Sequence, residues 1–178
     1  AIVNCQSKII LCGVGKSGLI AAKIASTLSS VGSPAFSLSA NDCLHGDLGS
    51  ITRKDILILI SNSGKSEEII PIIKFANRNK IKLIGIVSKK NSFLYKGSDI
   101  KILLPEVKES GLGVVPTSST SIQLAIGDAL AVAALKKKQF SKYDFSRLHP
   151  GGNLGKQLKT VGDIMAIGVR IPFISESK

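Results

Sequence analysis

The sequence contains no tryptophan, and aromatic residues make up only 4% of its 178 residues. Without large rings, the core has to be built from Ile, Leu, Val and Ala, and many of these are β-branched, as buried parallel strands prefer. The shortage of rings also leaves few side chains on which nucleic-acid bases stack. The composition therefore favours a packed aliphatic domain over a nucleic-acid-binding one.

Cysteines and long apolar runs are also scarce. The three cysteines, Cys5, Cys12 and Cys43, are odd in number and form no CxxC pair, which is typical of reduced thiols in a cytoplasmic protein. No apolar run reaches the ~20 residues of a membrane-spanning helix, and no signal-peptide pattern opens the chain. We therefore expect a cytoplasmic protein with no membrane partner.

The net charge is strongly positive, +12 at pH 7, but it is not gathered in one place. Lys and Arg occur singly along most of the chain. The one tight run, Lys136–Lys138, falls near the end of a predicted helix, where cations are favoured. Nucleic acid is therefore not the expected partner. A basic surface would instead help to attract an anionic metabolite.

Apolar runs alternate with amphipathic stretches, and clusters of Gly, Ser and Asn separate them. Strands are predicted over residues 8–12, 34–38, 55–60, 82–87 and 99–103. Long helices are predicted over 17–31 and 119–138, and a further helix follows SNSGKSEE and ends at about residue 79. Strands separated by helices imply parallel pairing with right-handed crossovers. We therefore expect a three-layer α/β/α sandwich around a five-stranded parallel sheet, with its ligand beyond the carboxyl ends of the strands.

The loop after the first predicted strand, Gly13–Gly18 (GVGKSG), fits the GxGxxG pattern of dinucleotide-binding proteins. Two features argue against NAD or FAD. Ser37 and Ser39 stand where a ribose-binding carboxylate would end the second strand, and Lys16 is unusual inside such a loop. The loop is not a Walker A sequence either, because Ile10 occupies the place of its first Gly. No cofactor is therefore expected.

The loop after the third predicted strand, Ser61–Glu68 (SNSGKSEE), is the strongest signal for a ligand. Three serine hydroxyls and a Gly lie between a buried strand and a helix N-terminus, where free N–H groups and the helix dipole favour an anion. The same residues would also serve as an N-cap with an acidic first turn. Since one serine suffices for a cap, three favour a bound phosphate.

Other candidates lie in the remaining loops. His45 and His149, the two histidines of the chain, occupy loop segments in which a histidine is either catalytic or incidental. Cys43, His45 and Asp47 alternate as metal ligands can, but their spacing matches no structural zinc pattern, and no metal is expected. Residues 116–120 (PTSST) form a second hydroxyl cluster at a helix start, which either caps the helix or binds a phosphorylated, polyhydroxylated ligand.

Taken in order, these loops resemble the sugar isomerase (SIS) domain and, within it, the arabinose-5-phosphate isomerases. The resemblance covers residues from about Lys8 to Met165 and is carried by GVGKSGLIAAKIASTLSSVGSPAF, HGDLG, SNSGKSEEI, GLGVVPTSST, GDALAVAAL and HPGGNLGK. SNSG followed by Ser is typical of SIS domains in general, whereas GKSG, HGDLG, PTSST and HPGG together point to the isomerases. The resemblance implies the SIS fold with a flavodoxin-like strand order.

The resemblance also implies roles for individual residues. The family's candidate catalytic positions are matched by Lys16, His45, Glu68 and His149. The phosphate and the sugar would be bound by Gly15, Ser17, Ser61, Asn62, Ser63, Ser66, Thr117, Ser118 and Ser119. Lys65 is a departure, because many relatives carry Glu there. Since Glu68 is retained, we expect an altered local charge without loss of catalysis.

The activity implied is interconversion of D-arabinose 5-phosphate and D-ribulose 5-phosphate through an enediol, which supplies Kdo for lipopolysaccharide or capsule. SIS sites are usually built between subunits, so a homotetramer is implied. A sugar-phosphate sensor without turnover and an isomerase of a related sugar phosphate are the alternatives. We expect a SIS domain over residues 1–160 and a linker over 161–178, where Val161–Met165 resembles the entry to the paired CBS domains of longer relatives, which this chain lacks.

Overall fold

The structure, a computed structural model, describes residues 1–151 and 159–174. The chain falls into two units, Ala1–Phe140 and Ser141–Lys178. The first unit contains five strands: β1 (Ile9–Gly13), β2 (Ala35–Ser39), β3 (Ile56–Ile60), β4 (Lys82–Val87) and β5 (Ile100–Leu103). They form one parallel sheet in the order β2-β1-β3-β4-β5, so the predicted five-stranded parallel sheet of flavodoxin-like order is confirmed.

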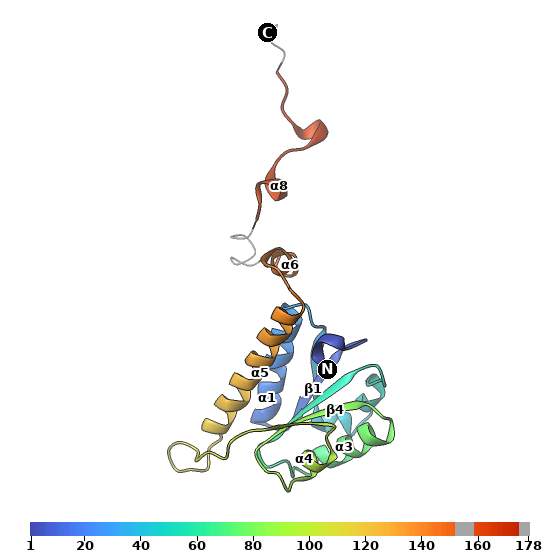
Figure 1. Cartoon of the computed structure of the whole chain (residues 1–178), viewed down its shortest axis with the longest axis vertical. Coiled ribbons are helices and arrows are strands. Elements are labelled where there is room, and N and C mark those ends of the chain that lie inside the picture. The colour runs from blue at the N-terminus through green and yellow to red at the C-terminus, as the bar shows by residue number, and fades with distance from the viewer. Residues whose placement is uncertain (152–158, 175–178) are drawn as a thin grey trace. The chain divides into compact units, whose positions relative to one another are not determined.

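Helices cover both faces of this sheet. The long ones are α1 (Lys16–Ser30), α3 (Ile69–Arg78) and α5 (Ser118–Lys137), and the short ones are η1 (Ile2–Asn4), α2 (Ala40–Cys43), η2 (Asp47–Ser50) and α4 (Phe93–Gly97). In Figure 1, α1 and α5 run side by side on one face, and α3 and α4 lie on the other. The predicted three-layer sandwich is therefore confirmed.

The strand residues divide between two hydrophobic cores because successive side chains of a strand point to opposite faces. Ile10 and Leu57 join the core that α3 covers. Their neighbours Ile9 and Ile58 join the core that α1 and α5 cover. All residues of β1 and β3 are buried, as expected for central strands of a parallel sheet with helices on both faces.

Helix α5 is the one helix of the described residues that has the length and apolar composition of a membrane span. In the structure it packs along α1, where Gly127 leaves so little room that a Cβ atom would overlap the Ile24 side chain. Asp128, the next residue, accepts a hydrogen bond from the Lys23 ammonium group of α1. The apolar face of α5 is therefore used in the helical layer of the domain.

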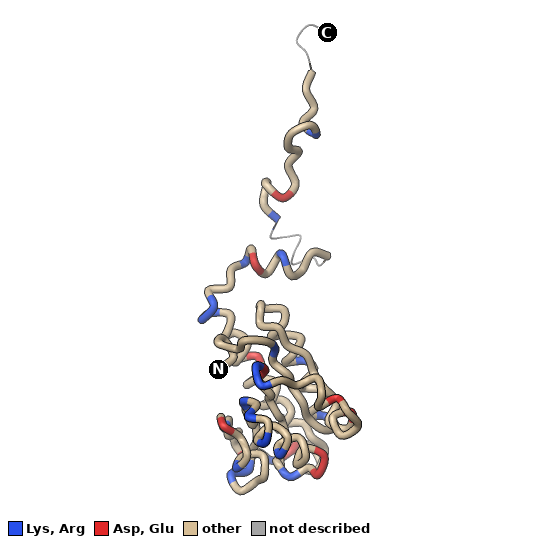
Figure 2. Tube along the Cα trace, turned by 90° about the vertical axis from the view of Figure 1, so that its right-hand side faces the viewer, with Lys and Arg blue, Asp and Glu red and all other residues tan. Residues whose placement is uncertain are grey.

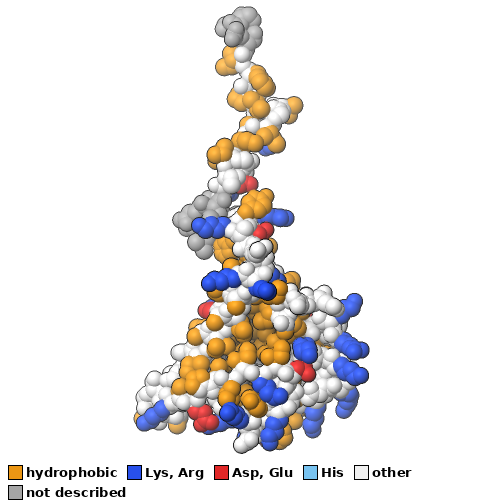
Figure 3. All heavy atoms as spheres, in the orientation of Figure 1, with side chains coloured by type: hydrophobic (Ala, Val, Ile, Leu, Met, Phe, Trp, Pro, Cys, Tyr) orange, Lys and Arg blue, Asp and Glu red, His pale blue; other side chains and the backbone are white. Residues whose placement is uncertain are grey.

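Charged and apolar groups occupy different parts of the surface. Figure 2 shows Lys and Arg spread over much of the trace, with Asp and Glu among them. Figure 3 shows an apolar patch beside α5, where a groove of about 450 Å³ is lined mainly by Ile84, Ile100, Ile102 and Leu130. Lys137, at the C-terminal end of α5, also lines this groove. The groove therefore lies away from the carboxyl ends of the strands.

The second unit begins with α6 (Lys142–Leu148), which a capping box of Ser141 and Asp144 starts. Two further short elements are α8 (Val161–Ile164) and η3 (Gly168–Arg170). Of the predicted HPGGNLGK motif, residues 152–156 lie outside the described residues, as do 175–178 of the predicted linker. The domain boundary expected at residue 160 stays a prediction.

Candidate functional site

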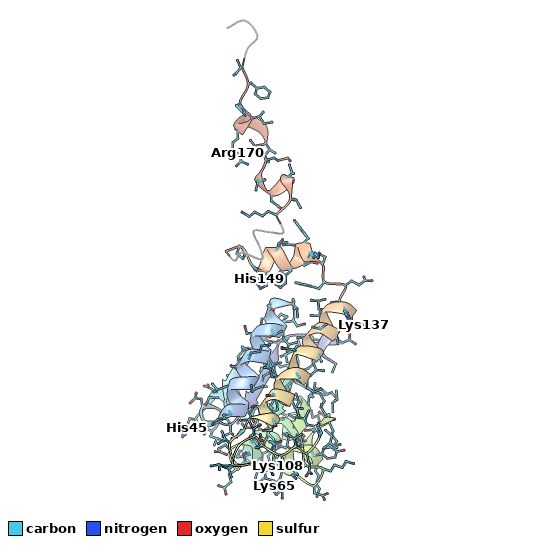
Figure 4. The ribbon with its side chains drawn as sticks, turned by 90° about the vertical axis from the view of Figure 1, so that its left-hand side faces the viewer. His45, Lys65, Lys108, Lys137, His149 and Arg170 are labelled. Carbon is cyan, nitrogen blue, oxygen red and sulfur yellow. The ribbon has the colours of Figure 1, made fainter. Side chains whose placement is uncertain are left out.

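The loops that carry the predicted residues follow neighbouring strands. Lys16 comes after β1, His45 after β2 and Glu68 after β3, and these three strands are adjacent in the sheet. Because the strands are parallel, their carboxyl ends meet at one edge. Figure 4 shows His45, Lys65 and Lys108 toward the same end of the first unit, and Lys137 toward the opposite end. The candidate site is therefore the carboxyl edge of the sheet.

The turn from β1 to α1 brings the helix start close to β3. A Cβ atom on Gly13 would lie 2.9 Å from the Ile60 carbonyl oxygen and from the Ser17 carbonyl group, so only glycine fits there. Gly15 has a φ of +56°, a left-handed conformation that glycine adopts without strain. As a result, Ser17 lies beside the end of β3, and Lys16 is exposed as the first residue of α1.

The turn after β3 is held by its own serines. Ser61 Oγ accepts a hydrogen bond from Gly64 N at 3.0 Å, and Ser63 Oγ accepts one from Lys65 N at 3.3 Å. Glu68, the N-cap residue of α3, is half-buried, and within the described chain it makes no side-chain capping hydrogen bond. Within the described residues, the hydroxyls of Ser61 and Ser63 accept from backbone groups that precede α3, so these serines do not cap that helix.

The two turns together form a polar pocket. It has a volume of about 220 Å³ and is lined by Val14, Ser17, Ile60, Ser61, Asn62, Ser63 and Ser66. Five of the predicted binding residues are therefore brought together from two loops that lie 44 residues apart in the chain (Ser17 to Ser61). Serine hydroxyls and an asparagine amide both donate hydrogen bonds, as a bound phosphate requires.

A second hollow lies on the other side of the β3 loop. Its volume is about 520 Å³, and its lining includes Ser63, Lys65, Ser88, Lys89 and Lys90. Glu106 also lines it and forms an ion pair with Lys89. The lysine that departs from the family pattern therefore belongs to a basic rim next to the polar pocket, and it adds positive charge there.

His45 follows the short helix α2. Ser39 Oγ caps this helix by accepting a hydrogen bond from Asp42 N at 3.4 Å, and His45 N donates to the Asp42 carbonyl oxygen at 2.9 Å. The His45 side chain is exposed. Gly46, with a φ of +123°, then turns the chain into η2. These contacts fix the backbone at His45 and leave its imidazole open to solvent.

The alternative of a metal site at Cys43, His45 and Asp47 gains no support. Among residues 1–151 and 159–174 there is no group of three His, Cys, Asp or Glu side chains that is suited to a metal ion. Cys43 is instead 1% exposed and lies in the same core as Cys12. Contact with the Cys43 thiol, together with burial, raises the pKa of Cys12 far above its usual range. Both side chains therefore serve as core residues.

The predicted hydroxyl cluster at the start of α5 binds a carboxylate of the same chain. Glu109 Oε2 accepts hydrogen bonds from Thr117 N at 2.8 Å, Thr117 Oγ1 at 3.2 Å and Ser119 N at 3.2 Å. Hydrogen bonds from Ser119 and Thr117 lower the pKa of Glu109 to about 2. Ser118 Oγ lies 3.5 Å from Ser110 Oγ. Contact of Thr117, Ser118 and Ser119 with a sugar stays a prediction.

Glu109 is therefore a residue that the sequence analysis missed. It belongs to the loop between β5 and α5, and it holds the start of α5 at a position where the helix dipole favours a negative charge. Its only sequence signal is its place in a long connection between two elements, which predicts a functional loop without selecting a residue.

His149 lies in the second unit, where it ends α6. Its Nδ1 is 2.8 Å from the Phe145 carbonyl oxygen, and its ring stacks on the Phe145 ring with centroids 3.8 Å apart. Both contacts stay within α6 and its cap. Membership of His149 in the site at the sheet edge stays a prediction.

The fold and the pocket define the class of protein: a parallel α/β domain with a hydroxyl-lined pocket where the β1 and β3 loops meet. Comparison with known proteins gives the family. The family profile described as "SIS domain" matches residues 2–133. The chain therefore belongs to the SIS domain family, as the sequence resemblance predicted.

Individual relatives have narrower names. Arabinose 5-phosphate isomerase KdsD of Yersinia pestis is 46% identical over 177 residues, which cover 98% of this chain and 54% of that protein. KdsD of Escherichia coli K12 is 42% identical over 175 residues, covering 97% and 53%. The chain thus spans about half the length of these curated relatives. A solved structure of an Escherichia coli CFT073 protein in complex with arabinose 5-phosphate has a TM-score of 0.81 and 37% identity, covering 84% of this chain and 80% of that one.

Proposed function

We propose that this chain is the isomerase domain of an arabinose 5-phosphate isomerase, which interconverts D-arabinose 5-phosphate and D-ribulose 5-phosphate. The observation that carries the proposal is the polar pocket, in which Ser17, Asn62 and three further serines surround a space of about 220 Å³ at the carboxyl edge of the sheet. The identity to the KdsD proteins and the similarity to a structure containing arabinose 5-phosphate support this substrate.

The phosphate of the sugar would occupy the polar pocket. It carries a charge of about −1.5 to −2 at neutral pH, so hydroxyl and amide donors beside the start of α1 stabilise it. Because the phosphate does not react, its binding energy serves to orient the reacting carbons at the other end of the sugar. Lys16 and His45 follow β1 and β2 at the same edge of the sheet and are exposed, and we assign them to that reacting end.

The reaction is a proton transfer on the open-chain sugar. A base removes the proton from C2, the C–H electron pair forms the C1–C2 double bond, and the π pair of the C1 carbonyl moves to O1, which gains a proton to give the enediol. O2 then loses its proton and becomes the carbonyl oxygen, while the double-bond electrons take up a proton at C1. His149 is our choice for the base, with His45 assisting ring opening. Lys16 steadies the developing oxyanion, and Glu68 orients a base or acts as one. Protons move without net oxidation, so the chemistry requires no redox cofactor.

The proposal extends to the setting of the enzyme. We propose a cytoplasmic homotetramer with sites between subunits that supplies Kdo for lipopolysaccharide or capsule. Residues 1–160 form its SIS domain, and 161–178 form a linker of the kind that leads to CBS domains in longer relatives. The resemblance of the motifs implies this setting, and the identity to the KdsD proteins supports the isomerase activity within it.

The decisive test is incubation of the purified chain with arabinose 5-phosphate in deuterated water, followed by NMR. We expect ribulose 5-phosphate to form with deuterium at C1, because the transferred proton exchanges with solvent. Ribose 5-phosphate, which differs only in its configuration at C2, is the matched control ligand and tests an isomerase of a related sugar phosphate. Saturable binding without conversion or exchange, in a confirmed tetramer, would instead identify a sensor. Absence of binding would contradict the substrate.

A further inference from the structure

Ser88, the residue after β4, forms hydrogen bonds to the loop that lines the polar pocket. Ser88 Oγ donates a hydrogen bond to Asn62 Oδ1 at 2.6 Å, and Ser88 N donates to the Asn62 carbonyl oxygen at 3.1 Å. Ser88 is only 6% exposed, whereas Asn62 is exposed and lines the pocket. Ser88 itself lines the second hollow and does not line the pocket. It therefore contacts the site through Asn62.

The backbone of this loop is held by contacts that do not involve the Ser88 hydroxyl. Leu94 N donates to the Gly64 carbonyl oxygen at 3.2 Å, and Ser61 N donates to the Ile86 carbonyl oxygen at 3.1 Å. Gly64, with a φ of +63°, is packed so closely that a Cβ atom would overlap the Ser92 side chain. The backbone is thus fixed on both sides of Asn62. The Ser88 hydroxyl determines how the amide of Asn62 is turned.

The orientation of this amide matters because its two ends have opposite chemistry. The side chain of asparagine has a carbonyl oxygen that accepts hydrogen bonds and an NH₂ group that donates two. An anion attracts the NH₂ group and repels the oxygen. Because Oδ1 accepts the hydrogen bond from Ser88, the NH₂ group is the end of the amide that can donate hydrogen bonds in the pocket. A free side chain would instead divide its time between both orientations.

We propose that Ser88 is a positioning residue for anion binding: its hydroxyl holds Asn62 so that the amide donates to the phosphate of the substrate. This inference rests on the proposed function for the identity of the substrate, and on the pocket alone for the anion. It differs from a purely structural role of Ser88, because satisfying a buried hydroxyl would affect stability and leave phosphate affinity unchanged.

The test measures the affinity of the whole chain for inorganic phosphate by calorimetry and, separately, KM and kcat for arabinose 5-phosphate. We expect Ser88→Ala to weaken phosphate binding and raise KM about fivefold, the effect of one ordinary hydrogen bond, with kcat nearly unchanged. Ser88→Thr, which keeps the hydroxyl, should restore both values. Ser98→Ala is the matched control, since Ser98 Oγ is also buried but donates to the Leu94 carbonyl oxygen; it should leave both values unchanged.

A double-mutant cycle tests whether Ser88 changes phosphate affinity through Asn62. On an Asn62→Ala background, Ser88→Ala should change phosphate affinity no further, because the side chain that it orients is gone. Equal losses on both backgrounds, or unchanged phosphate affinity in the single variant, would overturn the inference. Phosphate binding without turnover of arabinose 5-phosphate would refute the proposed isomerase activity and still test Ser88. If the unmodified chain binds no phosphate, both proposals fail.

Discussion

At the scale of single residues, the site combines groups with very different surroundings. Ser61 and Ser63 use their hydroxyls to shape the loop that presents Asn62. Lys16 and His45 are exposed and belong to no ion pair of the described residues. The pocket thus presents hydroxyl and amide groups suited to binding an anion, whereas the residues proposed for oxyanion stabilisation and ring opening are exposed and lie outside its lining.

His149 is the residue whose proposed role can be tested most directly. Replacing it by Ala should lower kcat at least about a hundredfold if its imidazole transfers the proton, since general bases contribute about 10² to 10⁴ in rate. Steady-state kinetics with arabinose 5-phosphate measures this effect. The variant also loses the stacking on Phe145, so its thermal unfolding must be compared with that of Phe145→Leu, which loses the ring stacking and keeps the imidazole. Near-normal turnover of His149→Ala would exclude it as the base.

At the scale of elements, the sequence predicted the regular framework closely. Every predicted strand agrees with the observed one to within one residue at each end, as do the predicted boundaries of α1 and α5 and the predicted end of α3. Buried parallel strands are continuous apolar runs, and long helices show a clear period, so both leave strong patterns. The short helices α2 and α4, of four and five residues, are too short to show a period, and they were missed.

The contacts that complete the site were less accessible to sequence reasoning. The hydroxyl-rich loops were found from their composition, and the structure gathers Ser17 with Ser61 and Asn62. The pairing of Glu109 with Thr117 was not found, because it depends on the path of an irregular loop. The same holds for the Ser88–Asn62 bond, which joins residues 26 positions apart. Local patterns thus identify which loops matter, while the packing of neighbouring loops decides the partners.

Asp55 ties the amino ends of two central strands together. Its carboxylate is 1% exposed and accepts hydrogen bonds from Lys8 Nζ at 2.9 Å, Lys8 N at 3.2 Å and Thr52 N at 2.6 Å. Burial raises the pKa of Asp55, but the hydrogen bonds from Lys8 and Thr52 lower it more, so the net pKa lies well below its usual range. The ionised carboxylate therefore stabilises the junction of β1 and β3.

Replacing Asp55 by Asn should lower the free energy of unfolding by about 2 kcal/mol at pH 7, because a charged acceptor of several bonds is lost. A depressed folded-state pKa means that the stabilisation is fully present above the unfolded value near 4 and is lost progressively as pH falls from there through the folded pKa. The difference in the free energy of unfolding between Asp55→Asn and the unmodified chain should therefore shrink at pH 3.

Urea denaturation at both pH values measures this difference. The control is Asp128→Asn, which breaks an exposed ion pair and should lower the free energy of unfolding by less than about 1 kcal/mol. A difference that does not depend on pH would contradict this account.

At the scale of the whole molecule, large apolar side chains remain exposed in the first unit. Leu19 on α1 is 73% exposed, and Leu112 and Val114 in the loop before α5 are 91% and 74% exposed. The groove beside α5 adds a further apolar surface. Exposed apolar surface of this kind is typical of proteins that associate, which supports the proposed homotetramer. Whether one site contains groups from two chains depends on how the subunits assemble, and the surroundings of a single residue do not predict that.

Mixing two inactive variants tests that sharing. If the proposed site takes Lys16 from one subunit and His149 from another, then Lys16→Ala and His149→Ala should each be inactive alone and should regain activity when mixed. In a random mixture about a quarter of the sites would contain both intact residues, so activity should approach a quarter of that of the unmodified chain. Native mass spectrometry must confirm that the subunits exchange. The matched control is a mixture of Lys16→Ala with a doubly substituted Lys16→Ala, His149→Ala chain, which contains no intact pair and should stay inactive. Exchange without recovered activity would mean that each site is built within one chain, and that assembly serves stability alone.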